Sequence, residues 1–375
     1  MSRQTRLRIR VDDRGVLEIV DPSWDCLELM HTLDPGFDIQ RAPIQASDKP
    51  RFLWSRRAGC GYVADELAAL PDASLWAAHA RVLQQLDADE VAMMEGDEAS
   101  LLDLKIELVR RNLMHCTLCT HRCGVNRLAG ESGVCRLGAV ANVAEHFVHI
   151  GEESMINPSL LISLAGCGLR CRYCQQSSIL DPANVDGETL DETLWAALDT
   201  EGARTLSFAG GNPDESLYAV LRFLALAPDD WDLPVVWNCH GAATLETISL
   251  LHGIVDVWLP DYKYGNEQCG HRWSGIRNYP NTAQDGIQAM LAQNIPVIVR
   301  ILVLPGHFEC CHAQVLKVLA SLAPTRNLTV SIRGQYCPDW RIRSRDGNMM
   351  RRPGVSEIAA VRAMAKELGL KSISS

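Results

Sequence analysis

The pattern of hydrophobic and polar positions changes character near residue 158. Beyond that point, apolar runs of strand length alternate with amphipathic stretches of helical period, as in repeated βα units. The expected strands are 160–165, 205–209, 234–239, 255–259, 296–304 and 328–333. The expected helices lie near 188–202, 214–227, 244–252, 282–294, 309–322 and 356–368. Six such units predict an α/β fold in which a parallel sheet, wrapped by helices, forms an open, partial (β/α)6 barrel.

The first 100 residues predict an N-terminal α+β extension with a structural or recognition role. Residues 7–11 and 16–20 alternate around a turn, as in a β-hairpin. Residues 34–59 contain three prolines and little periodicity, so we expect a loop there. One helix is expected after an N-cap at Ser74, and a second over about 98–114.

Charge and hydropathy exclude several classes of protein. A net charge of −10 and a pI near 5.6 argue against a nucleic-acid binder and against binding to an anionic membrane. No apolar run approaches the length of a membrane-spanning helix, and the N-terminus lacks the apolar stretch of a secretory signal. We therefore expect a cytoplasmic protein, in which the 14 cysteines are metal ligands or reactive thiols rather than disulfides.

Three of these cysteines follow the first barrel strand as Cys167-Gly-Leu-Arg-Cys171-Arg-Tyr-Cys174. Closed zinc sites and most iron–sulfur clusters take four thiolates. A four-iron cluster held by only three cysteines leaves one iron open, where a substrate or cofactor can bind. Three thiols in the spacing C-x₃-C-x₂-C are therefore candidate ligands of a metal centre with an open position.

Four more cysteines form a second group, with the spacing C-x₂-C-x₃-C-x₁₁-C: Cys116, Cys119, Cys123 and Cys135. Four thiolates with short spacing, and glycines for the tight returns, are typical of a closed metal site. Mononuclear zinc, mononuclear iron and a [4Fe–4S] cluster all remain open. His121 lies within the segment and could replace one cysteine. The chain then divides into the extension 1–100, a helix with this metal-binding segment 101–157, the barrel 158–340, and a basic loop with a helix 341–375.

The expected barrel strands end in glycine, proline or polar residues, which should meet at one mouth because active sites of such folds lie at the C-terminal ends of strands. The candidate cofactor-binding residues there are Tyr173, Gly210, Gly211, Asn212, Pro213, Asn238, Asp261, Lys263 and Arg300. The glycines allow close backbone approach, Pro213 fixes the turn, and Tyr173 is placed to pack on a ligand ring. A structural cap is an equally good interpretation of Asn238 as cofactor binding. A surface salt bridge between Asp261 and Lys263 is the alternative for that pair. Arg300 needs either a ligand carboxylate or a buried acid as its partner.

The remaining candidates have less specific signals. His240 and His307 could carry protons or cap turns. A buried, inert thiol is the default for the seven scattered cysteines, which are Cys26, Cys60, Cys239, Cys269, Cys310, Cys311 and Cys337. The arginines of 341–352 predict a solvated loop, with a docking surface for an acidic peptide or protein as the alternative.

Taken together, the motifs of residues 116–340 resemble the radical S-adenosylmethionine (radical SAM) superfamily. Within it they are most similar to the pyruvate formate-lyase activating enzyme-related (PflX-type) branch. The residues that carry the resemblance are Cys119-Thr-His-Arg-Cys-Gly-Val-Asn-Arg-Leu-Ala-Gly-Glu-Ser-Gly-Val-Cys135, Gly166-Cys-Gly-Leu-Arg-Cys-Arg-Tyr-Cys-Gln175, Leu250-Leu-His-Gly-Ile-Val-Asp-Val-Trp-Leu-Pro-Asp-Tyr-Lys263 and Val303-Leu-Pro-Gly-His307.

The resemblance implies that Cys167, Cys171 and Cys174 hold the [4Fe–4S] cluster and that 210–213 contacts S-adenosylmethionine (SAM). Asn212 stands where the family commonly has Glu. It further implies reductive cleavage of SAM to a 5′-deoxyadenosyl radical that abstracts hydrogen from a protein or peptide, with electrons from a donor such as flavodoxin or ferredoxin. The alternatives are a small-molecule substrate, a non-catalytic iron–sulfur electron-transfer protein, and a zinc-binding interaction module. A cobalamin methyltransferase is disfavoured because no cobalamin-binding segment is evident.

Overall fold

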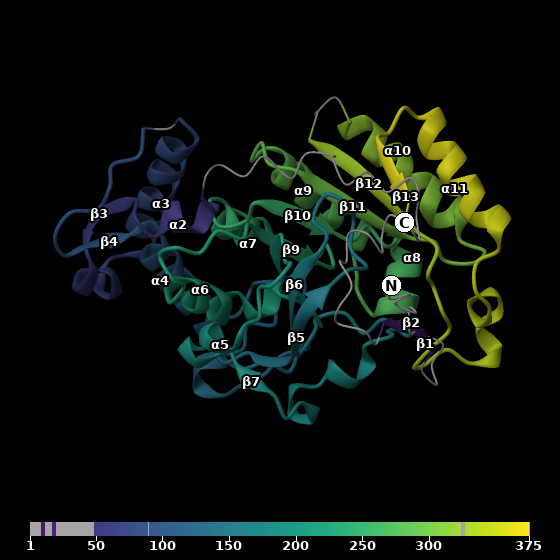
Figure 1. Cartoon of the computed structure of the whole chain (residues 1–375), viewed down its shortest axis with the longest axis horizontal. Helices are drawn as coiled ribbons and strands as arrows, with labels where there is room; N and C mark the ends of the chain where they lie inside the picture. The colour runs from purple at the N-terminus through teal and green to yellow at the C-terminus, as the bar shows by residue number, and fades with distance from the viewer. Residues whose placement is uncertain (1–8, 12–16, 20–48, 89, 324–326, 375) are drawn as a thin grey trace, which may run out of the picture.

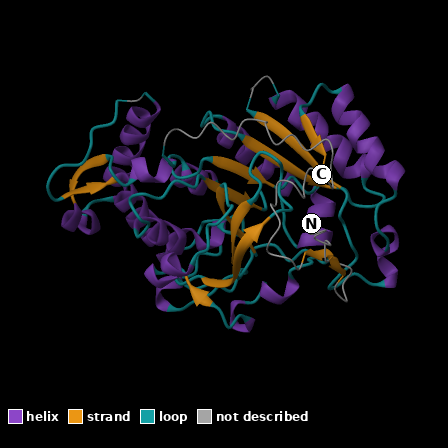
Figure 2. Cartoon of the chain, viewed as in Figure 1, coloured by secondary structure: helices purple, strands orange, loops and turns teal. Residues whose placement is uncertain are grey.

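The computed structural model describes residues 9–11, 17–19, 49–88, 90–323 and 327–374. Its centre is a nine-stranded sheet in the order β13-β12-β11-β10-β9-β8-β6-β5-β7. The six expected strands form its parallel middle: β6 (Ser159–Leu164), β8 (Thr205–Gly210), β9 (Val235–Cys239), β10 (Val257–Pro260), β11 (Val297–Leu302) and β12 (Leu328–Arg333). Figure 2 shows these strands as a curved, open sheet with helices along its outside. The expected partial (β/α)6 barrel is confirmed.

Three further strands extend the sheet beyond the six that the pattern predicted. They are β5 (Asn142–His149), β7 (Glu188–Thr189) and β13 (Ser372–Ser374). β5 pairs antiparallel with both β6 and β7, and β13 pairs parallel with β12. β5 and β7 lack the continuous apolar run of a buried parallel strand, and only Val143 among their residues is buried.

The barrel strands are apolar because both of their faces are covered. Every residue of β6 and β12 is buried, as expected for parallel strands that lie between helices and a barrel interior. The covering helices are α5 (Glu192–Ala197), α6 (Leu217–Ala225), α7 (Leu245–Leu251), α9 (Tyr279–Leu291), α10 (Ala313–Leu322) and α11 (Val355–Glu367). Figure 1 shows α9, α10 and α11 outside the sheet.

Short helical elements sit in the connections. They are η2 (Arg127–Ala129), η3 (Ser177–Ile179), η4 (Pro182–Asn184), η5 (Asp214–Ser216), η7 (Ser344–Met350), the helix α8 (Glu267–Ser274) and the π-helix η6 (Phe308–His312). The hydrophobic pattern did not predict α8, because its eight residues are mostly polar. Both α8 and η6 bear on the chemistry described below.

The N-terminal part contains the expected hairpin, β1 (Ile9–Val11) with β2 (Leu17–Ile19). It continues with α2 (Arg51–Ser55), β3 (Gly59–Val63), η1 (Ala64–Ala69), α3 (Asp72–Asp87), β4 (Glu98–Ser100) and α4 (Leu101–Met114). Figure 1 places α2, α3, β3 and β4 together at one end of the molecule. Their apolar side chains belong to the same continuous core as those of the barrel.

Three local predictions in this part are wrong. Residues 51–55, expected as loop, are helical. Ser74 lies within the first turn of α3 rather than at its N-cap, because Pro71 takes that position and fixes the extended backbone that precedes a helix. The second helix starts at Leu101 instead of residue 98. The reason is a capping box in which Ser100 accepts from the Asp103 amide and the Asp103 carboxylate accepts from the Ser100 amide.

Candidate active site at the barrel mouth

The three-cysteine loop follows β6 and is held from one side by α8. The amides of Arg170 and Arg172 donate to the carbonyls of Ser274 and Trp273, at 2.9 and 2.7 Å. The hydroxyl of Ser274 lies 2.9 Å from the sulfur of Cys171. These contacts fix the loop backbone in a segment that forms no helix or strand of its own. Ser274 therefore positions Cys171, a role that no local sequence signal indicated.

The loop forms one wall of a cavity of about 570 Å³ at the C-terminal ends of the parallel strands. Each of the six barrel strands contributes to this cavity from its end or from the loop that follows. The lining includes Cys167, Cys171, Tyr173 and Cys174 after β6, Gly210, Gly211 and Asn212 after β8, Asn238, Cys239 and His240 in and after β9, Asp261 and Lys263 after β10, Arg300 in β11, and Gln335, Tyr336 and Cys337 after β12. Of the predicted mouth residues only Pro213 does not line it; Pro213 is buried beside it.

The three thiols of the loop are protonated in the absence of a metal ion. Burial raises the pKa of the Cys167 and Cys171 thiols, and raises that of Cys174 to about 11. A soft metal that binds here therefore displaces protons, which makes its affinity depend on pH. Thiolates of this kind are the donors that iron–sulfur clusters prefer.

The hydroxyl of Tyr173 is hydrogen-bonded within the protein. It lies 2.7 Å from the hydroxyl of Tyr264, which lies 2.6 Å from the hydroxyl of Ser274. Since Ser274 also contacts Cys171, the four residues form one chain of hydrogen bonds that ends at a sulfur of the loop. Hydrogen bonds to ligating sulfur tune the potential of an iron–sulfur centre.

The two glycines after β8 are required by contacts within the protein. A Cβ at Gly210, whose φ is +99°, would lie 2.4 Å from the amide nitrogen of Leu164 in β6. A Cβ at Gly211 would lie 2.0 Å from the carbonyl oxygen of Gly166. We expected these glycines to allow a ligand to approach; the close approach that the structure contains is to β6 and to the start of the cysteine loop.

Asn212 and Glu215 tie three strand ends together beneath the cavity. Asn212 Oδ1 accepts from the amide of His240 at 2.9 Å, and its Nδ2 donates to Glu215. The other oxygen of Glu215 accepts from the amide of Gly168 at 2.9 Å and lies 3.0 Å from Nε2 of His240. Burial opposes the charge of Glu215, but His240 and these hydrogen bonds lower its pKa, so it is ionised. Glu215 is a positioning residue that sequence reasoning missed.

The charged residues of the cavity wall are paired with each other. Lys263 Nζ lies 2.5 Å from Asp261 Oδ2. Burial favours the neutral amine of Lys263, but the Asp261 carboxylate outweighs it and raises the pKa of Lys263. Arg300 binds the carboxylates of Glu152 and Glu153, the second at 2.6 Å, so its partner is a buried acid. Arg333 and Ser331 contact the same Glu153, at 2.9 and 2.7 Å.

The four-cysteine segment lies directly beside the three-cysteine loop. Cys116, Cys119, Cys123 and Cys135 line one small pocket, whose wall also includes Glu215. Nε2 of His121 lies 2.9 Å from the carbonyl oxygen of Gly168, so His121 contacts the loop and is not among the residues lining the pocket. Burial raises the pKa of the Cys135 thiol to about 11. No three of the four sulfurs lie within 4.8 Å of one another.

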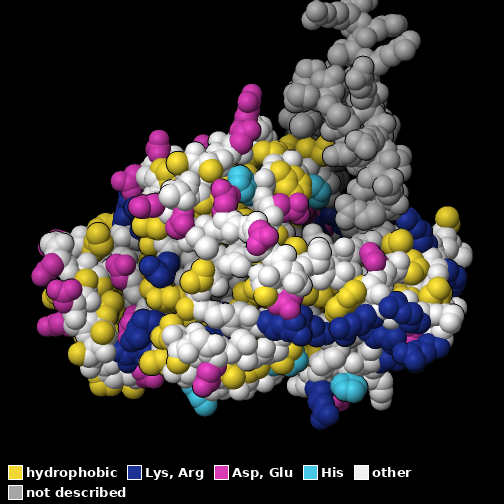
Figure 3. All heavy atoms as spheres, turned by 90° about the horizontal axis from the view of Figure 1, so that it is seen from below, with side chains coloured by type: hydrophobic (Ala, Val, Ile, Leu, Met, Phe, Trp, Pro, Cys, Tyr) yellow, Lys and Arg dark blue, Asp and Glu magenta, His cyan; other side chains and the backbone are white. Residues whose placement is uncertain are grey.

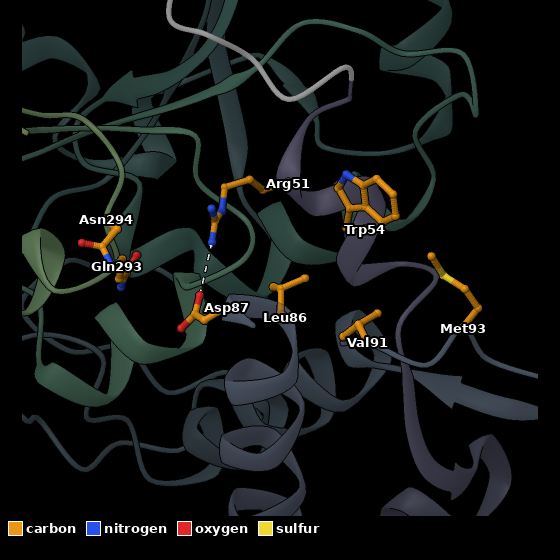
Figure 4. A pocket seen from close by; sticks show the side chains of 8 residues that line it. All are labelled: Arg51, Trp54, Leu86, Asp87, Val91, Met93, Gln293 and Asn294. Carbon is orange, nitrogen blue, oxygen red and sulfur yellow. Dashed lines mark ion pairs between the residues drawn. The ribbon is translucent and has the colours of Figure 1, made fainter. Parts of the chain in front are cut away.

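A second large cavity, of about 490 Å³, lies at the opposite end of the barrel (Figure 4). It is lined by Arg51 and Trp54 from α2, by residues at and beyond the end of α3, and by Gln293 and Asn294 just before β11. Arg51 and Asp87 form an ion pair of 3.9 Å across it. None of the predicted site residues lines this cavity.

Comparison with known proteins identifies the family. Residues 161–319, which contain the three-cysteine loop and five of the barrel strands, match the Radical SAM superfamily. The chain belongs to the radical SAM superfamily. It is also 30% identical, over 319 residues, to the uncharacterized protein MJ0674 of Methanocaldococcus jannaschii, an alignment that covers 82% of this chain and 92% of that protein.

Several solved structures are similar to this chain at low sequence identity and low TM-score. SuiB of Streptococcus suis is 10% identical with a TM-score of 0.37, covering 56% of this chain and 47% of SuiB, so the chain spans about half its length. A radical SAM methyltransferase from Sphaerobacter thermophilus is 12% identical with a TM-score of 0.40, covering 79% and 93% of the two chains. HydG, a maturase of the [FeFe]-hydrogenase, is 12% identical with a TM-score of 0.41, covering 83% and 70%.

Membership of this superfamily implies an enzyme that uses a [4Fe–4S] cluster and SAM and that needs an electron donor. The mouth fits both groups. Three cysteines face one cavity of about 570 Å³, and the rest of its wall combines polar and charged side chains with apolar ones such as Leu161, Leu169 and Leu302. No helix among the described residues is long and apolar enough to span a membrane.

Proposed function

We propose that this radical SAM enzyme abstracts hydrogen from a protein or peptide substrate, as an activating or a peptide-modifying enzyme, and that it belongs to the PflX-type branch. The observation that carries the radical chemistry is the cavity in which three cysteines meet the ends of six strands. Cys167, Cys171 and Cys174 would hold the cluster. When bound, the cluster and SAM supply a one-electron cleavage that yields a 5′-deoxyadenosyl radical.

The other mouth residues would bind and orient SAM. The backbone at Gly210 and Gly211 lies against β6 and offers carbonyl groups to an ammonium group. Lys263 is a cation of the cavity wall whose side chain is 15% exposed, and it suits a carboxylate. Asn238 lines the same cavity and suits a ribose hydroxyl. These groups are half-buried in the cavity wall, which limits the access of water to the reacting atoms.

A basic loop beside the mouth supports a peptide substrate. Arg341, Arg343, Arg345, Arg351 and Arg352 are all exposed, although the chain as a whole is acidic. The loop is joined to the cysteine loop, because Arg172 pairs with Asp346 at 2.8 Å and its carbonyl accepts from the Arg341 amide at 2.8 Å. Figure 3 shows Lys and Arg side chains gathered on the right-hand half of one face. Such a surface favours an acidic segment of a substrate protein.

The four-cysteine segment would hold a second metal centre, and its geometry favours a multi-iron cluster. Four thiolates around one zinc ion lie about 3.8 Å apart, because the Zn–S bond is about 2.3 Å. The sulfurs of this segment are more widely spaced, since no three of them lie within 4.8 Å of one another. A cluster here would stand between an external donor, such as flavodoxin or ferredoxin, and the mouth. Residues 1–100 would act as an appendage outside this chemistry.

Two measurements test the proposal. Anaerobically reconstituted, reduced protein should convert SAM to 5′-deoxyadenosine, and Cys171→Ala should abolish the conversion; retention of full activity would reject the radical assignment. For the substrate class, we expect deuterium transfer into 5′-deoxyadenosine from the protein fraction of a deuterated lysate, and none after protease treatment. Transfer from the small-molecule ultrafiltrate instead would reject a peptide substrate.

The basic loop can be tested separately. Arg341→Glu with Arg345→Glu should reduce deuterium transfer from the protein fraction while leaving the slow cleavage of SAM without substrate unchanged. Arg362→Glu, an exposed arginine of α11, makes the same kind of charge change elsewhere. Equal transfer by both variants would show that the loop does not bind the substrate.

A further inference from the structure

A third group of cysteines comes together away from the mouth cavity. Cys269 lies on α8, and Cys310 and Cys311 lie on the π-helix η6. Their three sulfurs all lie within 4.8 Å of one another, and among the described residues this is the only group of three or more such ligand atoms. The sulfur of Cys310 lies 4.0 Å from that of Cys269 and 3.8 Å from that of Cys311.

We propose that Cys269, Cys310 and Cys311 bind a zinc ion. Thiolates around tetrahedral zinc lie about 3.8 Å apart. The distances of 4.0 and 3.8 Å from Cys310 Sγ to the other two sulfurs match this value, and the third pair lies within 4.8 Å. The four sulfurs of the Cys116–Cys135 segment do not match it.

The π-helix is what allows two consecutive residues to contribute. In an α-helix, neighbouring side chains point in different directions, so adjacent cysteines do not face a common partner. A π-turn widens the helix locally, and such turns are frequent at functional sites. η6 is five residues long and is followed at once by the regular helix α10, so the wide turn is confined to the cysteine pair and its neighbours.

Polar groups surround the sulfurs in the way that supports metal ligands. The side-chain Nδ2 of Asn266 donates to Cys269 Sγ at 3.4 Å and to Cys311 Sγ at 3.6 Å. The Asn266 side chain is itself fixed, because its Oδ1 caps α8 by accepting from the backbone amide of Cys269 at 2.8 Å. Hydrogen bonds of this kind orient thiolate ligands and stabilise their charge.

An entry path and an open fourth position complete the site. His307 lies near Cys269, but both of its ring nitrogens are engaged, because Nε2 accepts from the indole of Trp273 at 3.0 Å and Nδ1 lies 2.9 Å from the carbonyl oxygen of Pro305. The three cysteines would therefore leave the fourth position of a tetrahedral zinc ion to a solvent or substrate ligand. Cys311 is fully buried, whereas Cys269 and Cys310 are partly exposed, so an ion can enter from solvent.

The site lies one helical turn from the groups that hold the cysteine loop. α8 carries Cys269 near its start, and Trp273 and Ser274 at its end. The carbonyls of Trp273 and Ser274 accept from the amides of Arg172 and Arg170, and the hydroxyl of Ser274 contacts Cys171. Zinc would join α8 to η6 and so fix the helix that braces the loop. This consequence rests on the proposed function, but zinc binding itself does not.

The metal content of the holoprotein tests the proposal. The Cys269→Ser/Cys311→Ser double variant should contain about one zinc ion per chain fewer than the wild type, with its iron content unchanged. Cys60→Ser, at a buried cysteine of the N-terminal part, should lose none. Equal zinc in the double variant and the wild type would overturn the proposal, as would a Cys269–Cys310 disulfide in anaerobically purified protein.

If the double variant does not fold, alkylation of the wild-type protein tests whether these cysteines bind zinc. Zinc should protect Cys269 and Cys310 from iodoacetamide, and removal of zinc by a chelator should expose them, as read by peptide mass spectrometry. Identical labelling with and without zinc would overturn the proposal. For the loop, chelation should lower the rate of 5′-deoxyadenosine formation about tenfold at constant iron content. If the wild type does not cleave SAM, the zinc measurements still stand.

Discussion

Charged side chains have different roles at the two ends of this barrel. At the mouth, charged and thiol side chains line an open cavity of about 570 Å³, and most of them belong to segments without regular structure. At the base, Asp256 is buried just before β10, and its carboxylate accepts from the backbone amides of Val235 and Arg51, at 2.7 and 3.0 Å. The mouth holds chemical groups in position, whereas the base joins the extension to the sheet.

The comparison separates two roles along one sheet: the C-terminal strand ends carry reactive groups, and the N-terminal strand ends join the extension to the barrel. The C-terminal ends of parallel strands lead into loops that can vary without disturbing the core, so reactive groups gather there. The N-terminal ends lie against α2, which also bonds to the barrel through Ser55 Oγ and the carbonyl of Gly253 at 2.7 Å. Substitutions at the mouth should therefore change activity, and substitutions at the base should change stability.

The largest effect is expected from Cys171→Ser at the mouth. If Cys171 is a cluster ligand, as proposed, its loss should lower the rate of SAM cleavage to below about one-thousandth, equivalent to about 4 kcal/mol of transition-state stabilisation. Thermal unfolding should shift little, because Cys171 is only partly buried by the protein and contacts the Ser274 hydroxyl. Cys60→Ala at the other end is the control and should retain cleavage. If the Cys171→Ser variant unfolds, the result would show instead that the loop is needed for the stability of the fold.

The next largest effect is expected at the base, in the pH dependence of stability. Burial raises the pKa of Asp256 to about 6, above its ordinary value of 3.8. Between these values the folded protein keeps a proton that the unfolded chain has lost, so the free energy of unfolding falls as pH rises from about 4 to 6, by about 3 kcal/mol.

Asp256→Asn cannot ionise and should remove this fall, although it also loses one backbone hydrogen bond. Denaturant titrations of both proteins at several pH values would measure the difference. The same slope in both would show that another group is responsible. SAM cleavage at neutral pH should be unchanged in the variant, because Asp256 lies at the far end of the strands.

A smaller effect is expected from Glu215→Gln, between the two cysteine groups. Its carboxylate bonds to Gly168 of the cysteine loop and to His240, and it also lines the four-cysteine pocket. The amide should weaken this network and lower activity or iron content about 10- to 100-fold. Rates per cluster and iron content should be compared with Glu201→Gln, an exposed glutamate. Unchanged values would mean that the network is not needed for the cluster loop.

The smallest effect is expected from Lys263→Met. The variant keeps the apolar stem but loses the ammonium group, so KM for SAM should rise about tenfold, or about 1.4 kcal/mol, with kcat less affected. Steady-state kinetics would measure both constants. Lys317→Met, at an exposed position of α10, is the matched control. A fall in kcat alone would give Lys263 a role in the chemical step.

Much of the site was predictable because its signals are local. The C-x₃-C-x₂-C spacing and the placement of glycine and polar residues after apolar runs require only a few consecutive residues. Ser274, Glu215 and the Glu152–Glu153 pair were not predicted. Each acts through a partner far away in the sequence, such as Cys171, Gly168 or Arg300. An isolated serine or glutamate carries no signal of such a contact.

The scattered cysteines show the same limit. We expected Cys269, Cys310 and Cys311 to be inert, because their spacing matches no metal-binding motif. The structure brings their sulfurs together through α8, which the hydrophobic pattern did not reveal, and through a π-turn, which no local pattern predicted.

By itself, the sequence determined the barrel, the two clustered cysteine groups and the strand ends that carry polar residues, because periodicity and short spacings act over a few residues. Only the tertiary structure decided which charges pair, why Gly210 and Gly211 must be glycine, and which distant cysteines meet. These outcomes depend on the packing of β8 against β6 and of α8 against η6. Contacts of this kind are set by the whole fold, so no short stretch of sequence contains them.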